Sequence, residues 1–132
     1  MPFLVGVGLA LAVAAMATVV GLDRERSFYT TVTMVVAHYY ALFAVLGGST
    51  HALVVESMAM TVFLAAAIVG FKVDLRVVAA ALVGHGVFDL VHGRWIENAG
   101  VPSWWPLFCM AFDVTAGACL AVILIRQRES RA

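Results

Sequence analysis

The sequence predicts an all-α integral membrane protein, folded as a single helical bundle of five transmembrane helices. The first observation is its composition, 64% hydrophobic and 12% charged with a mean hydropathy of +1.02, whereas soluble domains are about 45–50% apolar and about 25% charged. The second is that the apolar residues fall into five segments of roughly 20 residues, the length that a helix needs to cross a bilayer. Residues 1–132 are therefore interpreted as one transmembrane domain.

The first two spans are predicted over about 3–21 and about 28–46. The first contains no charged residue, and Arg24 and Arg26 follow it. A secretory signal would carry its basic residues before the apolar run, so we expect this segment to be retained as a transmembrane helix. The second span is expected to end at the Gly-Gly-Ser turn 47–49, because paired glycines favour turns.

The other three spans are predicted over about 50–71, 76–95 and 104–125. A polar stretch at 72–76, which contains a lysine, an aspartate and an arginine, separates the third span from the fourth. The turn 96–103 contains a glycine and a proline, both of which interrupt helices. This turn therefore separates the fourth span from the fifth.

The charges predict the orientation of the bundle. In a five-span topology, seven of the eight Lys and Arg residues lie on one side of the membrane, and only Arg94 lies on the other. The positive-inside rule then places the N-terminus out and the C-terminus in. Tryptophan is enriched at membrane interfaces, and all three tryptophans lie at the predicted outer boundary. The seven basic residues are Arg24, Arg26, Lys72, Arg76, Arg126, Arg128 and Arg131, and the tryptophans are Trp95, Trp104 and Trp105.

Seven histidine and acidic residues fall within or at the ends of the predicted spans, all in the outer half of the bilayer. Ionisable groups at membrane depth are costly and usually mark functional sites. We therefore expect them to converge on a polar cavity open to the outer side. They are His38, His51, Glu56, His85, Asp89, His92 and Asp113.

The fourth span carries the most informative spacing, H-x3-D-x2-H. Successive helical residues turn by about 100°, so His85, Asp89 and His92 fall within roughly 60° of one another. They could bind one metal ion together, or the carboxylate could orient a histidine. On the fifth span, Cys109 and Asp113 are four residues apart and also share a face.

The leading functional hypothesis is a membrane-embedded enzyme or small-molecule binding protein. Buried carboxylates and imidazoles suit acid/base chemistry on a lipophilic substrate, such as isomerisation, cyclisation or epoxide opening. The expected catalytic residues are Glu56, Asp89, Asp113 and His85. The expected substrate-binding residues are His38, Tyr39, His51, His92, Trp104, Trp105 and Cys109.

Three alternatives remain open. The histidines and carboxylates could bind a divalent metal through His85, Asp89 and His92, or a haem with His38 and His85 as axial ligands, although the sequence lacks the HExxH and C-x-x-C-H motifs. A proton-coupled transporter would also need buried ionisable groups, but the inner half offers no polar path and no inverted repeat is visible. Alternatively, the polar residues simply hold the helices together by hydrogen bonds.

The expected partners are membrane lipids and a lipophilic small molecule. A net charge of zero argues against a nucleic-acid partner. The uncharged first span is expected either at the lipid-facing periphery or in the interface of a homo-oligomer. No cofactor other than a divalent metal or a haem is indicated.

In general plan the chain resembles the sterol-isomerase-like membrane proteins, which are small helical bundles with His, Glu and Trp in an intramembrane pocket. This resemblance covers architecture and residue types, and no functional residue is transferred from it. The segment GHGVFDLVHGRWIENAGVPSWWPLFCMAFD, residues 84–113, also resembles segments of small bacterial membrane proteins classed as domains of unknown function. This second resemblance implies no activity. We expect a multi-pass protein of the bacterial inner (plasma) membrane.

Overall fold

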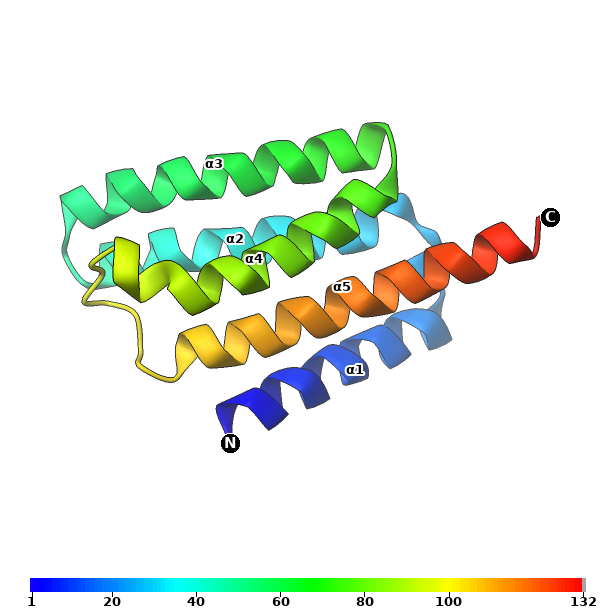
Figure 1. Ribbon diagram of the computed structural model, residues 1–132, viewed down its shortest axis with the longest axis horizontal. Coiled ribbons are helices and arrows are strands. Elements are labelled where there is room, and N and C mark those ends of the chain that lie inside the picture. Colours follow the sequence, from blue (N-terminus) through cyan, green and yellow to red (C-terminus); the bar gives the residue numbers. More distant parts are fainter. Residues whose placement is uncertain (132) are drawn as a thin grey trace.

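The computed structural model describes residues 1–131, and within them the fold is the predicted bundle of five helices (Figure 1). Each helix is long and apolar enough to span a membrane, which confirms the fold class. A short 3-10 turn, η1 (Leu22–Arg24), connects the first two helices. The helices are α1 (Pro2–Val20), α2 (Arg26–Leu46), α3 (Thr50–Lys72), α4 (Leu75–Trp95) and α5 (Trp105–Glu129).

The predicted helix ends differ from the observed ones by at most two residues, except at the end of α5. That helix continues to Glu129 instead of ending near 125. Its last turns contain Arg, Gln and Glu, which are good helix formers, and Arg126 and Arg128 interact favourably with the negative end of the helix dipole. The polar tail therefore extends the helix beyond the apolar segment.

Polar side chains cap two of the helices. At the start of α3, Ser49 Oγ accepts a hydrogen bond of 3.1 Å from the backbone N–H of Ala52. At the start of α4, Asp74 Oδ1 accepts one of 2.9 Å from the N–H of Arg76. Each cap satisfies a backbone donor that has no partner within the helix. The caps therefore define where the two helices that carry Glu56 and His85 begin.

Helix α5 lies between α1 and α4, while α3 packs against both α2 and α4 (Figure 1). Among the described helices, α1 contacts only α5, so it occupies the edge of the bundle as expected for an uncharged span. Small residues make this contact close: Gly6, Ala10 and Ala17 are the buried residues of α1. A side chain at Gly6 would collide with the carbonyl oxygen of Phe108 on α5.

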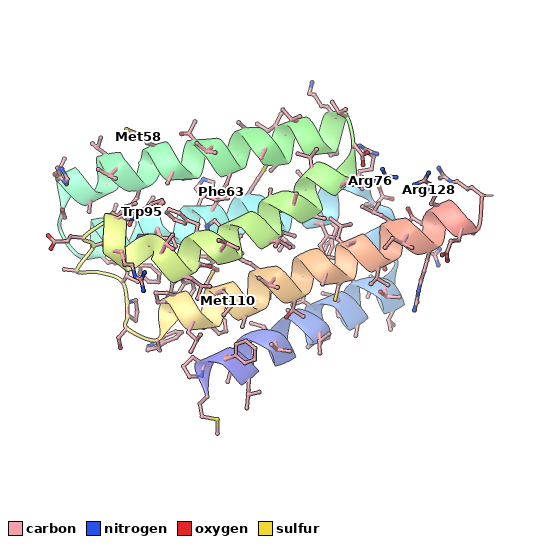
Figure 2. All side chains as sticks on the ribbon, viewed as in Figure 1. Met58, Phe63, Arg76, Trp95, Met110 and Arg128 are labelled. Atoms are coloured by element: carbon pink, nitrogen blue, oxygen red, sulfur yellow. The ribbon has the colours of Figure 1, made fainter. Side chains whose placement is uncertain are left out.

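The two ends of the bundle differ in composition. Because successive helices are antiparallel, Arg76 and Arg128 lie at one end, whereas Trp95 lies at the other (Figure 2). We call them the arginine end and the tryptophan end, after the seven basic residues and the three tryptophans grouped above. The assignment of the tryptophan end to the outer side of the membrane stays a prediction.

The surface of the bundle is apolar, and its interior combines apolar side chains with polar and charged ones. Leu4, Val19, Met58 and Leu90 are examples of large apolar side chains that are exposed, as expected for helices that face lipid. The buried residues instead include many alanines and seven polar or charged side chains. These seven are Thr30, Thr33, Glu56, His85, Asp89, His92 and Asp113.

Candidate functional site

The site is built at the seam between α4 and α5, where two glycines let the helices approach closely. A Cβ atom at Gly86 would lie 2.8 Å from Val114 Cγ2 and 3.1 Å from the carbonyl oxygen of Met110. One at Gly117 would lie 3.0 Å from the carbonyl oxygen of Ala79. A side chain at either position would force the facing helix to shift, so glycine permits the close packing observed here. Gly86 and Gly117 therefore bring α4 and α5 into close contact at the site.

Four side chains meet at this seam, and we call them the quartet: His85, Asp89, Cys109 and Asp113. Two come from an H-x3-D spacing on α4 and two from a C-x3-D spacing on α5, so each helix contributes an i, i+4 pair on one face. One ligand atom from each of the four lies within 4.8 Å of the others. Each of the four residues is at most 2% exposed.

Within the quartet, the Asp113 carboxylate is the centre of the hydrogen bonding. His85 Nδ1 donates to Asp113 Oδ2 at 2.6 Å, and the Cys109 thiol donates to the same oxygen at 3.6 Å. The second carboxylate is further away, with Asp89 Oδ2 at 3.7 Å from His85 Nδ1. One imidazole therefore lies between two carboxylates.

Two oxygens of the quartet have no hydrogen-bond partner within the described residues, Asp89 Oδ2 and Asp113 Oδ1. Buried acceptors are normally paired, and an unpaired one costs about 1–3 kcal/mol. Residues 1–131 also provide no Lys or Arg that forms an ion pair with either carboxylate. The quartet thus has more negative groups and more acceptors than the surrounding protein satisfies.

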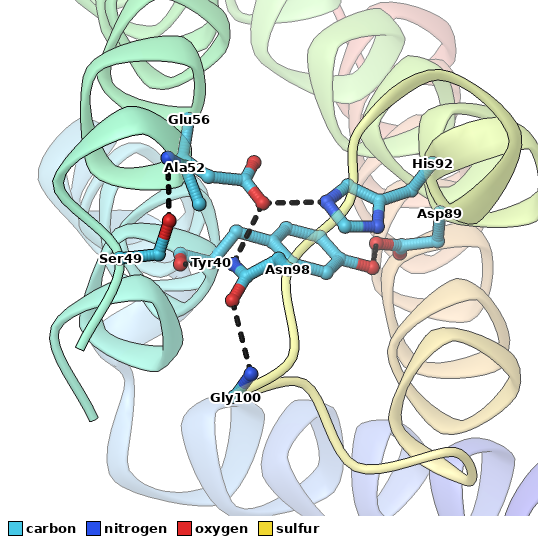
Figure 3. Close-up of polar contacts among 8 residues, drawn as sticks. All are labelled: Tyr40, Ser49, Ala52, Glu56, Asp89, His92, Asn98 and Gly100. Carbon is cyan, nitrogen blue, oxygen red and sulfur yellow. Dashed lines mark hydrogen bonds and ion pairs between the residues drawn. The ribbon is translucent and has the colours of Figure 1, made fainter. Parts of the chain in front are cut away.

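A second polar cluster, which we call the Glu56 group, consists of Glu56, His92 and Asn98. Glu56 Oε1 accepts hydrogen bonds from His92 Nε2 at 2.7 Å and from Asn98 Nδ2 at 2.8 Å (Figure 3). Asn98 also donates to the carbonyl oxygen of Tyr40 at 3.0 Å and accepts from the N–H of Gly100 at 3.2 Å. The turn after α4 is therefore attached to α2 and α3.

Tyr40 connects the two clusters. Its hydroxyl donates a 2.6 Å hydrogen bond to Asp89 Oδ1. Its ring stacks on His92, with the ring centroids 3.9 Å apart and an interplanar angle of 15° (Figure 3). A continuous set of contacts thus joins Glu56 to Asp89 through His92 and Tyr40.

The predicted convergence of seven ionisable groups is wrong for two of them, because His38 and His51 are exposed. His38 Nδ1 donates to the carbonyl oxygen of Met34 in its own helix. Depth in the membrane can be read from the sequence, but the direction in which a side chain points depends on which face of its helix packs. The exposure of His38 also removes the basis for pairing it with His85 as axial ligands of a haem.

The metal-ligand set expected from H-x3-D-x2-H changes in one member. His85 and Asp89 lie together, but His92 belongs to the Glu56 group. It is seven residues from His85, which corresponds to about 10 Å along the helix axis. Cys109 and Asp113 from α5 take its place beside His85 and Asp89.

The aromatic residues expected to bind a substrate pack against one another at the tryptophan end. Tyr39 is partly buried and packs against Trp105 at a centroid distance of 4.9 Å. Trp104 is 50% exposed and lies 5.6 Å from Trp105. The indole nitrogen Nε1 of Trp105 is buried without a partner in the described residues. Whether these side chains bind a substrate stays a prediction.

The sequence-based set missed Tyr40 and Asn98. A signal existed for Tyr40, since it lies on the same helical stripe as Thr33, Ala37 and Ala44, all of which are buried. Small and polar residues at this spacing mark the face of α2 that enters the bundle. Asn98 offers no comparable signal, because an asparagine in a turn most often only hydrogen-bonds to the backbone of that turn.

A hollow of about 460 Å³ opens at the tryptophan end, beside the Glu56 group. His92 and Asn98 line it together with Gly93, Pro102 and Pro106. It corresponds in position to the predicted outer cavity. The hollow reaches the Glu56 group, whereas the quartet lies deeper in the bundle, with its residues at most 2% exposed.

Comparison of the chain with protein-family models, with curated proteins and with solved structures found no match. The resemblances drawn from the sequence therefore stay predictions. The fold and the site together describe a protein of five apolar helices with a buried His/Asp/Cys cluster. This arrangement is compatible with a pocket inside a membrane.

Proposed function

We propose that this chain is an integral membrane metal-binding protein whose quartet holds one divalent transition-metal ion of the zinc type. The observation that carries the proposal is that an imidazole, two carboxylates and a thiol, all buried, offer ligand atoms within 4.8 Å of one another. Their sequence spacing places them on facing turns of two helices in direct contact.

The chemistry of the donor set supports an ion of this type. Zinc is bound by cysteine sulfur, histidine nitrogen and carboxylate oxygen, usually in tetrahedral four-coordination with bonds of about 2.0–2.3 Å. Around such an ion, ligand atoms stand roughly 3.3–3.8 Å apart. In the quartet the ligand atoms lie within 4.8 Å of one another, and His85 Nδ1 lies 3.7 Å from Asp89 Oδ2, one of the two oxygens without a hydrogen bond. Magnesium and calcium prefer all-oxygen sites, so the imidazole and the thiol argue against them.

The charge of the site supports a bound cation. Two carboxylates and an ionisable thiol surround one imidazole at the α4–α5 seam. Isolated charges in a low-dielectric interior cost several kcal/mol each. A divalent cation would neutralise them and would occupy the two oxygens that lack hydrogen bonds, Asp89 Oδ2 and Asp113 Oδ1.

Tyr40 would orient one of the metal ligands without binding the ion itself. By donating to Asp89 Oδ1, it fixes the carboxylate and leaves Oδ2 directed to the other ligands. Such outer hydrogen bonds orient metal ligands and raise affinity. Four protein ligands make a closed site, and closed sites are typical of structural metals. The bound ion would therefore lock α4 to α5.

The test is metal analysis of detergent-purified protein carrying an affinity tag without histidines. We expect one equivalent of metal in the wild type by elemental analysis and none, after a chelator wash, in Asp113→Asn. Exchange into Co²⁺ would give visible bands of a tetrahedral site and a thiolate charge-transfer band. The matched pair of cysteine variants assigns that band: Cys109→Ala removes it and Cys119→Ala retains it. A metal-free wild type, or one equivalent retained by Asp113→Asn, would overturn the proposal.

A second candidate function rests on the hollow at the tryptophan end. His92 lines this hollow while its Nε2 donates to Glu56. An imidazole paired to a carboxylate can transfer protons to a bound molecule, so acid/base chemistry on a lipophilic substrate would take place here and not at the quartet. Lipid profiles of cells that express the wild type or His92→Gln would test it. A lipid converted only by the wild type is expected, and identical profiles would contradict this function.

A further inference from the structure

The arginine end contains a second and larger hollow, of about 900 Å³. Its walls come from three regions that are distant in sequence. These are η1 with the first residue of α2, the turn between α3 and α4 with the first two residues of α4, and the last three turns of α5 with the two residues that follow it. Its volume is within the range of small-molecule sites, about 300–1,000 Å³. It lies at the opposite end of the bundle from the Glu56 group and its hollow.

The lining of this hollow is strongly basic. Five arginines against two aspartates give a formal charge of +3. Two of the arginines, Arg76 and Arg128, are visible at the same end of the bundle in Figure 2. The arginines are Arg24, Arg26, Arg76, Arg128 and Arg131, and the aspartates are Asp23 and Asp74.

Not all of these charges are available to a ligand. Arg26 donates to the carbonyl oxygens of Gly70 and Phe71 at the end of α3, with its shortest hydrogen bond at 2.7 Å. Arg76 lies 3.8 Å from Asp74. By contrast, no ion pair within residues 1–131 involves Arg24, Arg128 or Arg131.

Apolar residues lie beside the charged ones. Leu120, Ile123 and Leu124 of α5 line the same hollow, together with Val73 and Leu75 from the other side. Ile123 and Leu124 lie one turn before Arg128, so the lining changes from apolar to basic along one face of the helix. A ligand that matches this lining has an anionic head and an apolar tail.

We propose that this hollow binds an anionic phospholipid, with its phosphate against Arg24, Arg128 and Arg131 and an acyl chain along Ile123 and Leu124. Guanidinium groups bind phosphate through paired hydrogen bonds, and basic pockets between transmembrane helices bind anionic headgroups. A free phosphate ion would use the arginines but would leave the apolar wall without a partner. The proposal is independent of metal binding by the quartet.

Native mass spectrometry of the detergent-purified full chain would test it, with phosphatidylglycerol and phosphatidylcholine of identical acyl chains as probes. We expect one phosphatidylglycerol to bind at least tenfold more tightly than phosphatidylcholine, and added salt to weaken it. In the variant Arg24→Gln/Arg128→Gln the preference should fall at least tenfold. The control Arg94→Gln removes the one basic residue of the tryptophan end and should leave the preference unchanged.

Three results would overturn the proposal. Equal binding of the two lipids would show that the arginines do not select a charge. A preference unchanged in Arg24→Gln/Arg128→Gln would show that the lipid binds elsewhere. Arg24→Lys/Arg128→Lys keeps the charge and controls for misfolding, because a lipid preference retained in it shows that substitution at these two positions does not by itself abolish binding. Displacement of phosphatidylglycerol by equimolar inorganic phosphate would identify a phosphate ion as the ligand. A lipid preference in metal-free protein would still support this site while contradicting the metal proposal.

Discussion

The quartet and the Glu56 group are both buried polar clusters, yet their charges balance differently. In the Glu56 group one carboxylate meets one imidazole and one amide, and both of these donors are directed to the same oxygen, Glu56 Oε1. In the quartet two carboxylates compete for one imidazole. Each of the three carboxylates in the two clusters, Glu56 included, retains one oxygen without a donor among the described residues, so the clusters differ in the number of carboxylates that share an imidazole. A cluster with one carboxylate per imidazole can hold helices together by itself, whereas the excess of carboxylates in the quartet is what the proposed cation would balance.

This difference separates two roles that the sequence alone could not separate. The Glu56 group joins α3, α4 and the turn that follows α4, and it therefore behaves as a structural connection. The residues of the quartet come from α4 and α5, with Tyr40 of α2 bonded to Asp89, and two of its oxygens have no hydrogen-bond partner in the described residues. The variants below are chosen to affect one cluster while leaving the other intact, beginning with the largest expected effect.

Glu56→Ala would break the Glu56 group. It leaves the buried side chain of His92 and the amide of Asn98 without their acceptor, and removal of one partner of a buried pair costs about 3–5 kcal/mol. We expect this loss in the free energy of unfolding, measured by SDS titration in detergent micelles, with metal content unchanged. Glu97→Ala, an exposed acid in the same turn, is the control. Loss of metal in Glu56→Ala would show that the two clusters are one site.

Gly86→Ala would separate the two helices of the quartet. The added methyl group would collide with Val114 and with the carbonyl oxygen of Met110, and overpacking of this kind costs about 1–3 kcal/mol. We expect that loss in the same unfolding assay, together with weaker metal binding in a chelator competition. Gly84→Ala is the control, because its methyl group would lie 4.0 Å from the nearest atom, in Phe63. Equal metal affinity in the two variants would contradict the importance of the close seam.

Tyr40→Phe would remove the connection between the clusters while keeping the stacked ring. The lost hydrogen bond to Asp89 is worth about 1 kcal/mol, and loss of an outer partner lowers metal affinity by about 10- to 100-fold. The free energy of unfolding can be measured by SDS titration. The metal affinity can be measured on the same preparation by titrating metal into protein that a chelator has stripped of its ion. Tyr39→Phe serves as the control and should match the wild type. A wild-type metal affinity in Tyr40→Phe would limit the hydroxyl to a packing role.

His38→Ala and His51→Ala should have the smallest effect. Both histidines are exposed and belong to neither cluster. We expect metal content and the thermal midpoint of unfolding to equal those of the wild type. A loss of metal in either variant would mean that the side chain turns toward the interior when the ion is bound.

The fold could be predicted from the sequence because the segments are long, strongly apolar and separated by charged or glycine-containing stretches. From the sequence, the H-x3-D pair could be assigned to one face of α4 and the C-x3-D pair to one face of α5. Their meeting was not predicted, since it depends on how far each helix rotates about its axis. The rotation depends on the close contacts that Gly86 and Gly117 make with the backbone of the facing helix. His92 was wrongly placed beside His85 because a shared face does not imply a shared height.

The contact between α1 and α5 has a consequence for the order in which the molecule is made. The first helix has no helical neighbour within residues 1–131 except the last one. During synthesis α1 therefore has no helix of this bundle to pack against until α5 has been inserted. Glu56 and His92 can pair as soon as α4 and its following turn emerge, but Cys109 and Asp113 arrive only with α5. We therefore expect the quartet to assemble after the Glu56 group, when α5 docks between α4 and α1.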